Sequence, residues 1–220
     1  MAEPRALVLA CGTWPSPEMV HELANQFEHV VALDGALDIC QQHGLRADVL
    51  LGDMDSIEPE RRAAFVENGG TVIVRSQQDA HDLAKALAYL KEMGADACTV
   101  LGATGGDPQH EWANMLSCAA SSLEITCIST DHIYQFLNPN VHYSIAAEPS
   151  VEFSLFALPT ATGIHLEGVS FPLKGERLEM GSRGLHNIAI GTSIRLSFGE
   201  GRLMLMKPLT TERMEGKSEA

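Results

Sequence analysis

Two aspartates that follow an apolar run are the first candidates for chemistry in this chain. Asp53 and Asp55 stand two residues apart in the sequence LLGDMDSI, directly after the run at residues 49–51. If that run ends a buried strand, the next loop lies at the carboxyl edge of a sheet, where open α/β sheets bind ligands. Alternate side chains of extended backbone share a face, and Mg²⁺ is commonly held by one or two carboxylates plus substrate phosphates. The motif predicts a magnesium site; the alternative is an ordinary Gly/Asp turn.

Acidic residues also follow other apolar runs of the same half. Asp34 and Gly35 come directly after the run at residues 29–33, although an aspartate in that position is more often a helix cap. The sequence QDAHD at 78–82 opens a helix, and Asp82 lies one turn into it. Asp82 could complete a three-carboxylate metal set with Asp53 and Asp55; the alternative is an acid favoured by the helix dipole.

A glycine-rich turn follows the apolar run that ends at residue 101. The sequence LGATGGD at 101–107 leads into a helix that carries His110 and Asn114 at i and i+4. Such a turn lets backbone N–H groups approach a phosphate closely. It contains neither the dinucleotide fingerprint nor the lysine of a Walker loop, and a His/Asn pair also occurs on helix faces without a role. Many strand-to-helix loops carry no acid, so the turns together indicate one ligand site.

Two patterns of secondary structure divide the chain near residue 130. Residues 1–130 alternate short apolar runs with amphipathic segments, which is typical of an α/β domain with a mainly parallel, Rossmann-like sheet. The predicted strands are 6–11, 29–33, 48–51, 71–74, 97–101 and 124–129, and the predicted helices are 17–27, 36–43, 59–67, 80–93 and 108–121.

The second half, residues 131–220, shows period-two alternation between Gly, Pro and Asn residues and no convincing helix. This pattern predicts an all-β sandwich domain. The predicted strands are 133–137, 141–146, 151–157, 163–169, 177–180, 185–190, 192–198 and 202–207.

Composition narrows the classes of partner. The 220 residues carry a formal net charge of −14, which repels nucleic acid and anionic membranes. No apolar stretch approaches the ~18 residues of a membrane span. The five cysteines include no C-x-x-C pair, which favours reduced thiols. We therefore expect a cytoplasmic protein with no nucleic-acid or membrane partner.

The order of these motifs resembles that of the thiamine pyrophosphokinase family. The matching stretches are DGA at 34–36, ADVLLGDMDSI at 47–57, QDAHD at 78–82, LGATGG at 101–106 and HEWAN at 110–114. The resemblance implies a homodimer with an α/β nucleotide- and metal-binding half and a β-sandwich half that completes the acceptor site and the dimer interface. It implies Mg²⁺-dependent transfer of diphosphate from ATP to the hydroxyl of thiamine, giving thiamine diphosphate and AMP.

The resemblance also assigns roles to single residues. It makes Asp53, Asp55 and Asp82 the metal ligands and Asp34 the substrate-side acid, all four catalytic. An exposed aspartate titrates near ~4, so we rank Asp34 as orienter of the hydroxyl first and as base second. The implied ATP-binding positions are Gly35, Ser56, Gln78, Asp79, His81, Gly105, Gly106, His110 and Asn114. The implied thiamine-binding positions besides Asp34 are Ser182, His186 and Asn187.

Two stretches depart from the family pattern. The family's G-G-R-x-D-H is GGDPQH here, so Asp107 replaces an arginine whose fork suits phosphate. The family's C-terminal S-N pair is His186-Asn187. Two alternatives therefore stay open, namely diphosphotransfer to another heterocyclic alcohol such as a hydroxymethylpterin, and a nucleotide- or thiamine-binding regulator without turnover. Three cations are candidates to replace the missing arginine: Arg75, Lys85 and Arg183.

Overall fold

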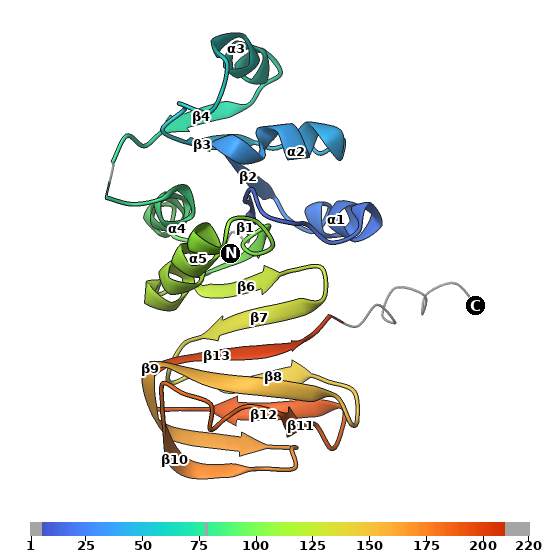
Figure 1. Cartoon of the computed structure of the whole chain (residues 1–220), viewed down its shortest axis with the longest axis vertical. Coiled ribbons are helices and arrows are strands. Elements are labelled where there is room, and N and C mark those ends of the chain that lie inside the picture. The colour runs from blue at the N-terminus through green and yellow to red at the C-terminus, as the bar shows by residue number, and fades with distance from the viewer. Residues whose placement is uncertain (1–5, 78, 210–220) are drawn as a thin grey trace, which may run out of the picture. The chain divides into compact units, whose positions relative to one another are not determined.

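The computed structural model describes residues 6–77 and 79–209. The chain divides into two compact units, residues 1–129 and 130–220. Helices alternate with strands in the first unit, and the described part of the second contains strands alone (Figure 1). The mixed α/β character with many strands that the sequence predicts is confirmed.

The first unit is built on six parallel strands. In space their order is β4-β3-β2-β1-β5-β6, and each neighbouring pair runs parallel. The chain therefore steps outward from β1 to β4 and then crosses back to β5. That reversal between β1 and β5 is where such sheets open a crevice at the carboxyl ends of their strands. The strands are β1 (Ala6–Leu9), β2 (His29–Leu33), β3 (Val49–Gly52), β4 (Thr71–Val74), β5 (Ala97–Leu101) and β6 (Glu124–Ile128).

Helices connect these strands, with α1 and α2 on one side of the sheet and α4 and α5 on the other (Figure 1). Prolines occupy the first positions of α1, α3 and α5, where the missing N–H costs no hydrogen bond. In α4 the apolar stripe of Leu83, Leu87 and Leu90 is buried. The helical segments are α1 (Pro17–Ala24), a 3₁₀ turn η1 (Asp34–Ala36), α2 (Leu37–Gln42), α3 (Pro59–Glu67), α4 (Asp82–Glu92) and α5 (Pro108–Ala120).

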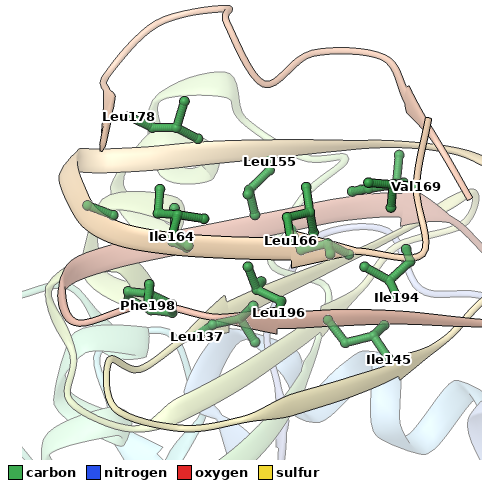
Figure 2. Close-up of a cluster of buried hydrophobic side chains, with 14 of the residues drawn as sticks. Leu137, Ile145, Leu155, Ile164, Leu166, Val169, Leu178, Ile194, Leu196 and Phe198 are labelled. Atoms are coloured by element: carbon green, nitrogen blue, oxygen red, sulfur yellow. The ribbon is translucent and has the colours of Figure 1, made fainter. Parts of the chain in front are cut away.

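The second unit is antiparallel throughout its described strands. The order is β7-β13-β9-β12-β8, and β10 and β11 also pair with β9. Apolar side chains such as Leu155, Leu166 and Leu196 form its core (Figure 2). The strands are β7 (His132–Leu137), β8 (Tyr143–Ala146), β9 (Glu152–Glu167), β10 (Leu173–Glu179), β11 (Asn187–Ile188), β12 (Ser193–Ser197) and β13 (Glu200–Pro208).

One prediction about the second unit is wrong. The predicted strands at 151–157 and 163–169 fall in the single strand β9, although Pro159 lies between them and Gly163 begins the second. β13 pairs with β9 on both sides of Pro159, but the other partners of β9 differ along its length, since Phe153 pairs with β11 whereas Thr160 and Leu166 pair with β10. Proline and glycine therefore fall where the strand changes neighbours, not at a loop. The two-layer sandwich arrangement stays a prediction.

None of the described helices has the length and hydropathy needed to cross a membrane. All five cysteines are free thiols, and four of them are buried.

Candidate active site

A pocket of about 270 Å³ opens at the carboxyl edge of the parallel sheet. It lies where the sheet order reverses, because residues after β1 and after β5 both line it. The two loops are joined there by backbone hydrogen bonds, with Gly12 N donating to Gly102 O and Thr13 N to Thr104 O, both at 2.8 Å. Segments after β2 and β3 and the first turns of α4 and α5 complete the wall. The predicted convergence of strand ends is therefore present in the geometry, and that they bind one ligand stays a prediction.

Asp34 is the buried carboxylate of this pocket, with 4% of its surface exposed. Its Oδ1 accepts from the Gly35 N–H at 2.6 Å and its Oδ2 from the Met54 N–H at 3.2 Å. Met54 adopts a φ of 69°, a left-handed conformation that is rare for such a residue and occurs often at functional sites. The loop after β3 is thus fastened to the end of β2 through one side chain.

Asp34, Asp53 and Asp55 form one group of carboxylates. Each offers an oxygen, and these oxygens lie within 4.8 Å of one another. Three carboxylate oxygens at this spacing suit a hard cation such as Mg²⁺. Ser56 follows directly, lines the pocket and donates to Asp55 Oδ1 at 3.0 Å. The donor set therefore fits a divalent ion.

Asp82, the third metal ligand predicted from the sequence, is not part of this group. Its Oδ1 accepts from Lys85 Nζ at 2.9 Å, and the same ammonium lies 3.5 Å from Asp53 Oδ2. The Lys85 side chain is only 3% exposed. A buried cation therefore lies between the predicted ligands, and Asp34 is the third member of the carboxylate group in place of Asp82.

The carboxylates differ in their proton affinity. Burial, together with the negative charge of Asp82, raises the pKa of Asp34 to about 6. Desolvation alone would also raise the pKa of Asp53, but hydrogen bonds from Asp55 and the charge of Lys85 outweigh it and lower that pKa. Pairs of acids whose pKa values are shifted in opposite directions are typical of active sites.

The metal-free protein should lose stability as pH rises through the titration of Asp34. A folded-state pKa raised from 3.8 to about 6 means that folding favours the protonated form, so its contribution is complete below pH ~4 and lost above pH ~6. Relative to Asp34→Asn, the free energy of unfolding of wild type should fall by roughly 1–3 kcal/mol between pH 4 and pH 7. Urea unfolding without divalent ions measures this fall. A difference independent of pH would contradict this.

Gly52, the last residue of β3, leaves room for Asp34. A Cβ at Gly52 would lie 2.6 Å from Asp34 Cγ and 2.7 Å from its Oδ2. We expect Gly52→Ala to displace the carboxylate and weaken Mn²⁺ binding by about tenfold, while the circular dichroism spectrum stays unchanged. Electron paramagnetic resonance of free Mn²⁺ measures this. Gly191→Ala is the control, because its new Cβ meets nothing within 4 Å; equal affinities in the two variants would refute the role of Gly52.

The glycine-rich turn and the start of α5 form the opposite wall. Gly106 and His110 line the pocket, and Asp107 caps α5 by accepting from the Gln109 N–H at 2.7 Å. Asn114 is buried and donates to Ala103 O at 2.9 Å, so its amide fixes the turn. Asn114 therefore shapes the pocket from within the protein.

His81 and Asp79 precede α4 and have different surroundings. His81 lines the pocket and its Nε2 lies 2.7 Å from Ser117 Oγ, so it joins α4 to α5. Burial lowers the pKa of His81, which favours the neutral ring at pH 7. Asp79 is exposed. Gln78 lies outside the described residues.

In the second unit, Asn187 differs from its two neighbours in the predicted thiamine-binding loop. Asn187 is buried; its Nδ2 donates to Phe171 O at 2.8 Å and its Oδ1 accepts from the Phe171 N–H at 3.0 Å. Its amide is thus used to hold the chain at Phe171. His186 is exposed and its Nδ1 pairs with Glu152, and Ser182 is exposed as well.

Sequence reasoning missed how Lys85 and Glu111 act. Of the three cations considered as replacements for the arginine, Arg75 pairs with Glu92 and Arg183 with Glu176, whereas Lys85 lies beside the carboxylate group. The signal available was its position three residues after Asp82 in a helix with an apolar stripe. Glu111 lines the pocket, and nothing in the sequence distinguishes it from an ordinary first-turn acid.

Comparison with known proteins shows what the first unit resembles. The family model of the thiamin pyrophosphokinase catalytic domain matches residues 20–128. These residues are therefore similar to that catalytic domain. Thiamine pyrophosphokinase 1 of Oryza sativa subsp. japonica is 34% identical over 116 residues, which are 49% of this chain and 44% of that protein. Thiamine pyrophosphokinase 3 of the same plant is 31% identical over 115 residues, 49% and 43% of the two chains. The match thus spans less than half of each relative.

Solved structures of thiamin pyrophosphokinases share the fold of most of the chain. Thiamine pyrophosphokinase from Bacillus subtilis superposes with a TM-score of 0.75 at 21% identity and covers 93% of this chain and 98% of its own. Thiamin pyrophosphokinase from Candida albicans gives a TM-score of 0.73 at 16% identity and covers 94% and 90%. At these identities the likeness shows the fold alone.

Proposed function

We propose that this chain transfers a diphosphate group from ATP to the hydroxyl of thiamine, giving thiamine diphosphate and AMP. The observation that carries the proposal is the group of Asp34, Asp53 and Asp55, with oxygens within 4.8 Å of one another, of which Asp34 lines the pocket of a domain that matches the thiamin pyrophosphokinase catalytic model. The thiamine oxygen would form a bond to the β-phosphorus of ATP, the bond from that phosphorus to the bridging oxygen of the α-phosphate would break to release AMP, and the hydroxyl proton would pass to water.

Such a reaction depends on positioning and charge neutralisation more than on a covalent intermediate. Asp53 and Asp55, with Asp34, would hold Mg²⁺, which when bound neutralises charge on the phosphates. Asp34 sits deepest and is fixed by two backbone N–H groups, so it is suited to orient the hydroxyl by accepting its hydrogen bond. Asp82 would act through Lys85, which it holds beside Asp53.

We further propose how the remaining predicted residues take part. Gly35, Ser56, His81, Gly106 and His110 line the pocket and are the proposed contacts for ATP. Ser182 and His186 remain the proposed contacts for thiamine, whereas the amide of Asn187 is occupied within the protein. The homodimer, in which a second copy completes the acceptor site, and the cytoplasmic location stay part of this proposal.

The test is to incubate the protein with Mg·ATP and thiamine and to measure AMP. We expect AMP formation that depends on thiamine and equals the thiamine diphosphate formed. AMP that appears only with another alcohol, such as a hydroxymethylpterin, would show that this alcohol and not thiamine is the acceptor. Nucleotide binding without AMP would overturn the proposal in favour of a regulator.

A further inference from the structure

Three N–H groups, one in the glycine-rich turn and two in the first turn of α5, are already bonded to carboxylates of the chain itself. Gly105 N donates to Glu111 Oε2 at 3.1 Å. Gln109 N and His110 N donate to Asp107 Oδ1 at 2.7 and 3.4 Å. These are the amides through which a glycine-rich turn and a helix N-terminus ordinarily bind a phosphate. Two side-chain anions take that position here.

The charges of the residues that line the pocket also disfavour a phosphate at this turn. Asp107 and Glu111 both line the pocket, as do Asp34 and Asp82. None of the described residues that line it is a lysine or an arginine. Lys85, the buried cation closest to this set, is paired with Asp82 and Asp53. A phosphate oxygen at the turn would therefore meet two carboxylates at close range with no cation to offset them.

We propose that Asp107 and Glu111 close the glycine-rich turn to phosphate, so that the part of the ligand lying against α5 carries no negative charge. The nature of that ligand rests on the proposed function, and the closing of the turn does not. For a nucleotide this assigns the α5 wall to the nucleoside and leaves the phosphates to the end of the pocket at Asp34, next to Asp53 and Asp55. Asp107 and Glu111 are then residues that determine ligand orientation.

Neutral variants can remove the charges and keep the fold. Asparagine caps helices as well as aspartate does, so Asp107→Asn keeps α5 capped, but by a neutral oxygen that diphosphate can displace from Gln109 N. Glu111→Gln likewise leaves a neutral, displaceable oxygen beside Gly105 N. The control is Glu60→Gln, which removes one charge from the first turn of α3, outside the residues that line the pocket.

The experiment is a titration with inorganic diphosphate, without divalent ions, followed by ¹H–¹⁵N correlation spectra. In the double variant Asp107→Asn/Glu111→Gln we expect saturable shifts at the amides of Gly105, Gln109 and His110, with an affinity at least about tenfold above that of wild type and of Glu60→Gln. Saturable shifts at these amides in wild type with equal affinity would overturn the proposal. So would a folded double variant that shows none.

This result does not depend on turnover. Absence of thiamine-dependent AMP formation would contradict the proposed function but not the proposal that the turn is closed to phosphate. Binding of diphosphate at the turn in wild type would contradict the closed turn but not the proposed function.

Discussion

Replacement of Asp53 by asparagine is expected to reduce thiamine-dependent AMP formation by at least about 100-fold. Asp53 offers an oxygen to the group with Asp34 and Asp55 and also faces Lys85 Nζ at 3.5 Å. An amide keeps the shape of the side chain but supplies a weaker metal ligand and no negative charge. The fold should be retained, because the Asp53 side chain is 26% exposed and belongs to a loop.

The measurement is AMP release per enzyme at saturating ATP and thiamine, with circular dichroism and thermal unfolding on the same samples. Asp96→Asn is the control, since this aspartate is exposed in the loop before β5 and does not line the pocket. Undiminished AMP release by Asp53→Asn would show that this carboxylate group is not the centre of the reaction.

Removal of the buried cation should have the largest effect on stability. Lys85→Met leaves Asp53 and Asp82 facing each other without the ammonium that lies 3.5 and 2.9 Å from them. Breaking a fully buried pair costs about 3–5 kcal/mol, and the partly exposed carboxylates here reduce the expected loss in free energy of unfolding to about 2 kcal/mol. Urea unfolding without divalent ions measures it.

Two further variants separate the causes. Lys91→Met removes an exposed lysine from the last turn of the same helix and should cost less than about 1 kcal/mol. Lys85→Met/Asp82→Asn removes one of the stranded charges and should be more stable than Lys85→Met alone. If the double variant were the less stable of the two, charge would not be what Lys85 contributes.

The sequence predicted the parallel half closely because its signals are local. The strands at 29–33, 71–74 and 97–101 and the helix at 59–67 have the predicted bounds. Apolar runs, prolines at helix starts and glycines after helix ends all act within a few residues. In the second half, β9 was predicted as two strands because its continuity depends on partner strands that are distant in the sequence.

The site was predicted only in part for a similar reason. The approach of Asp34 to Asp53 and Asp55 depends on Gly52, which has no Cβ to occupy that space, and on the left-handed turn at Met54 that brings its N–H to Asp34. These are contacts between segments about twenty residues apart, and motif spacing does not report them. The displacement of Asp82 by a lysine on its own helix depends on a rotamer, which is equally invisible in sequence.

The most direct test of the account is an anomalous difference map from crystals grown with Mn²⁺ and a non-hydrolysable ATP analogue. We predict a peak within bonding distance of oxygens of Asp34, Asp53 and Asp55, with the phosphates of the analogue beside it and its nucleoside against α5. A Mn²⁺ peak away from these three aspartates, or phosphates bound to the amides of Gly105 and Gln109, would contradict it.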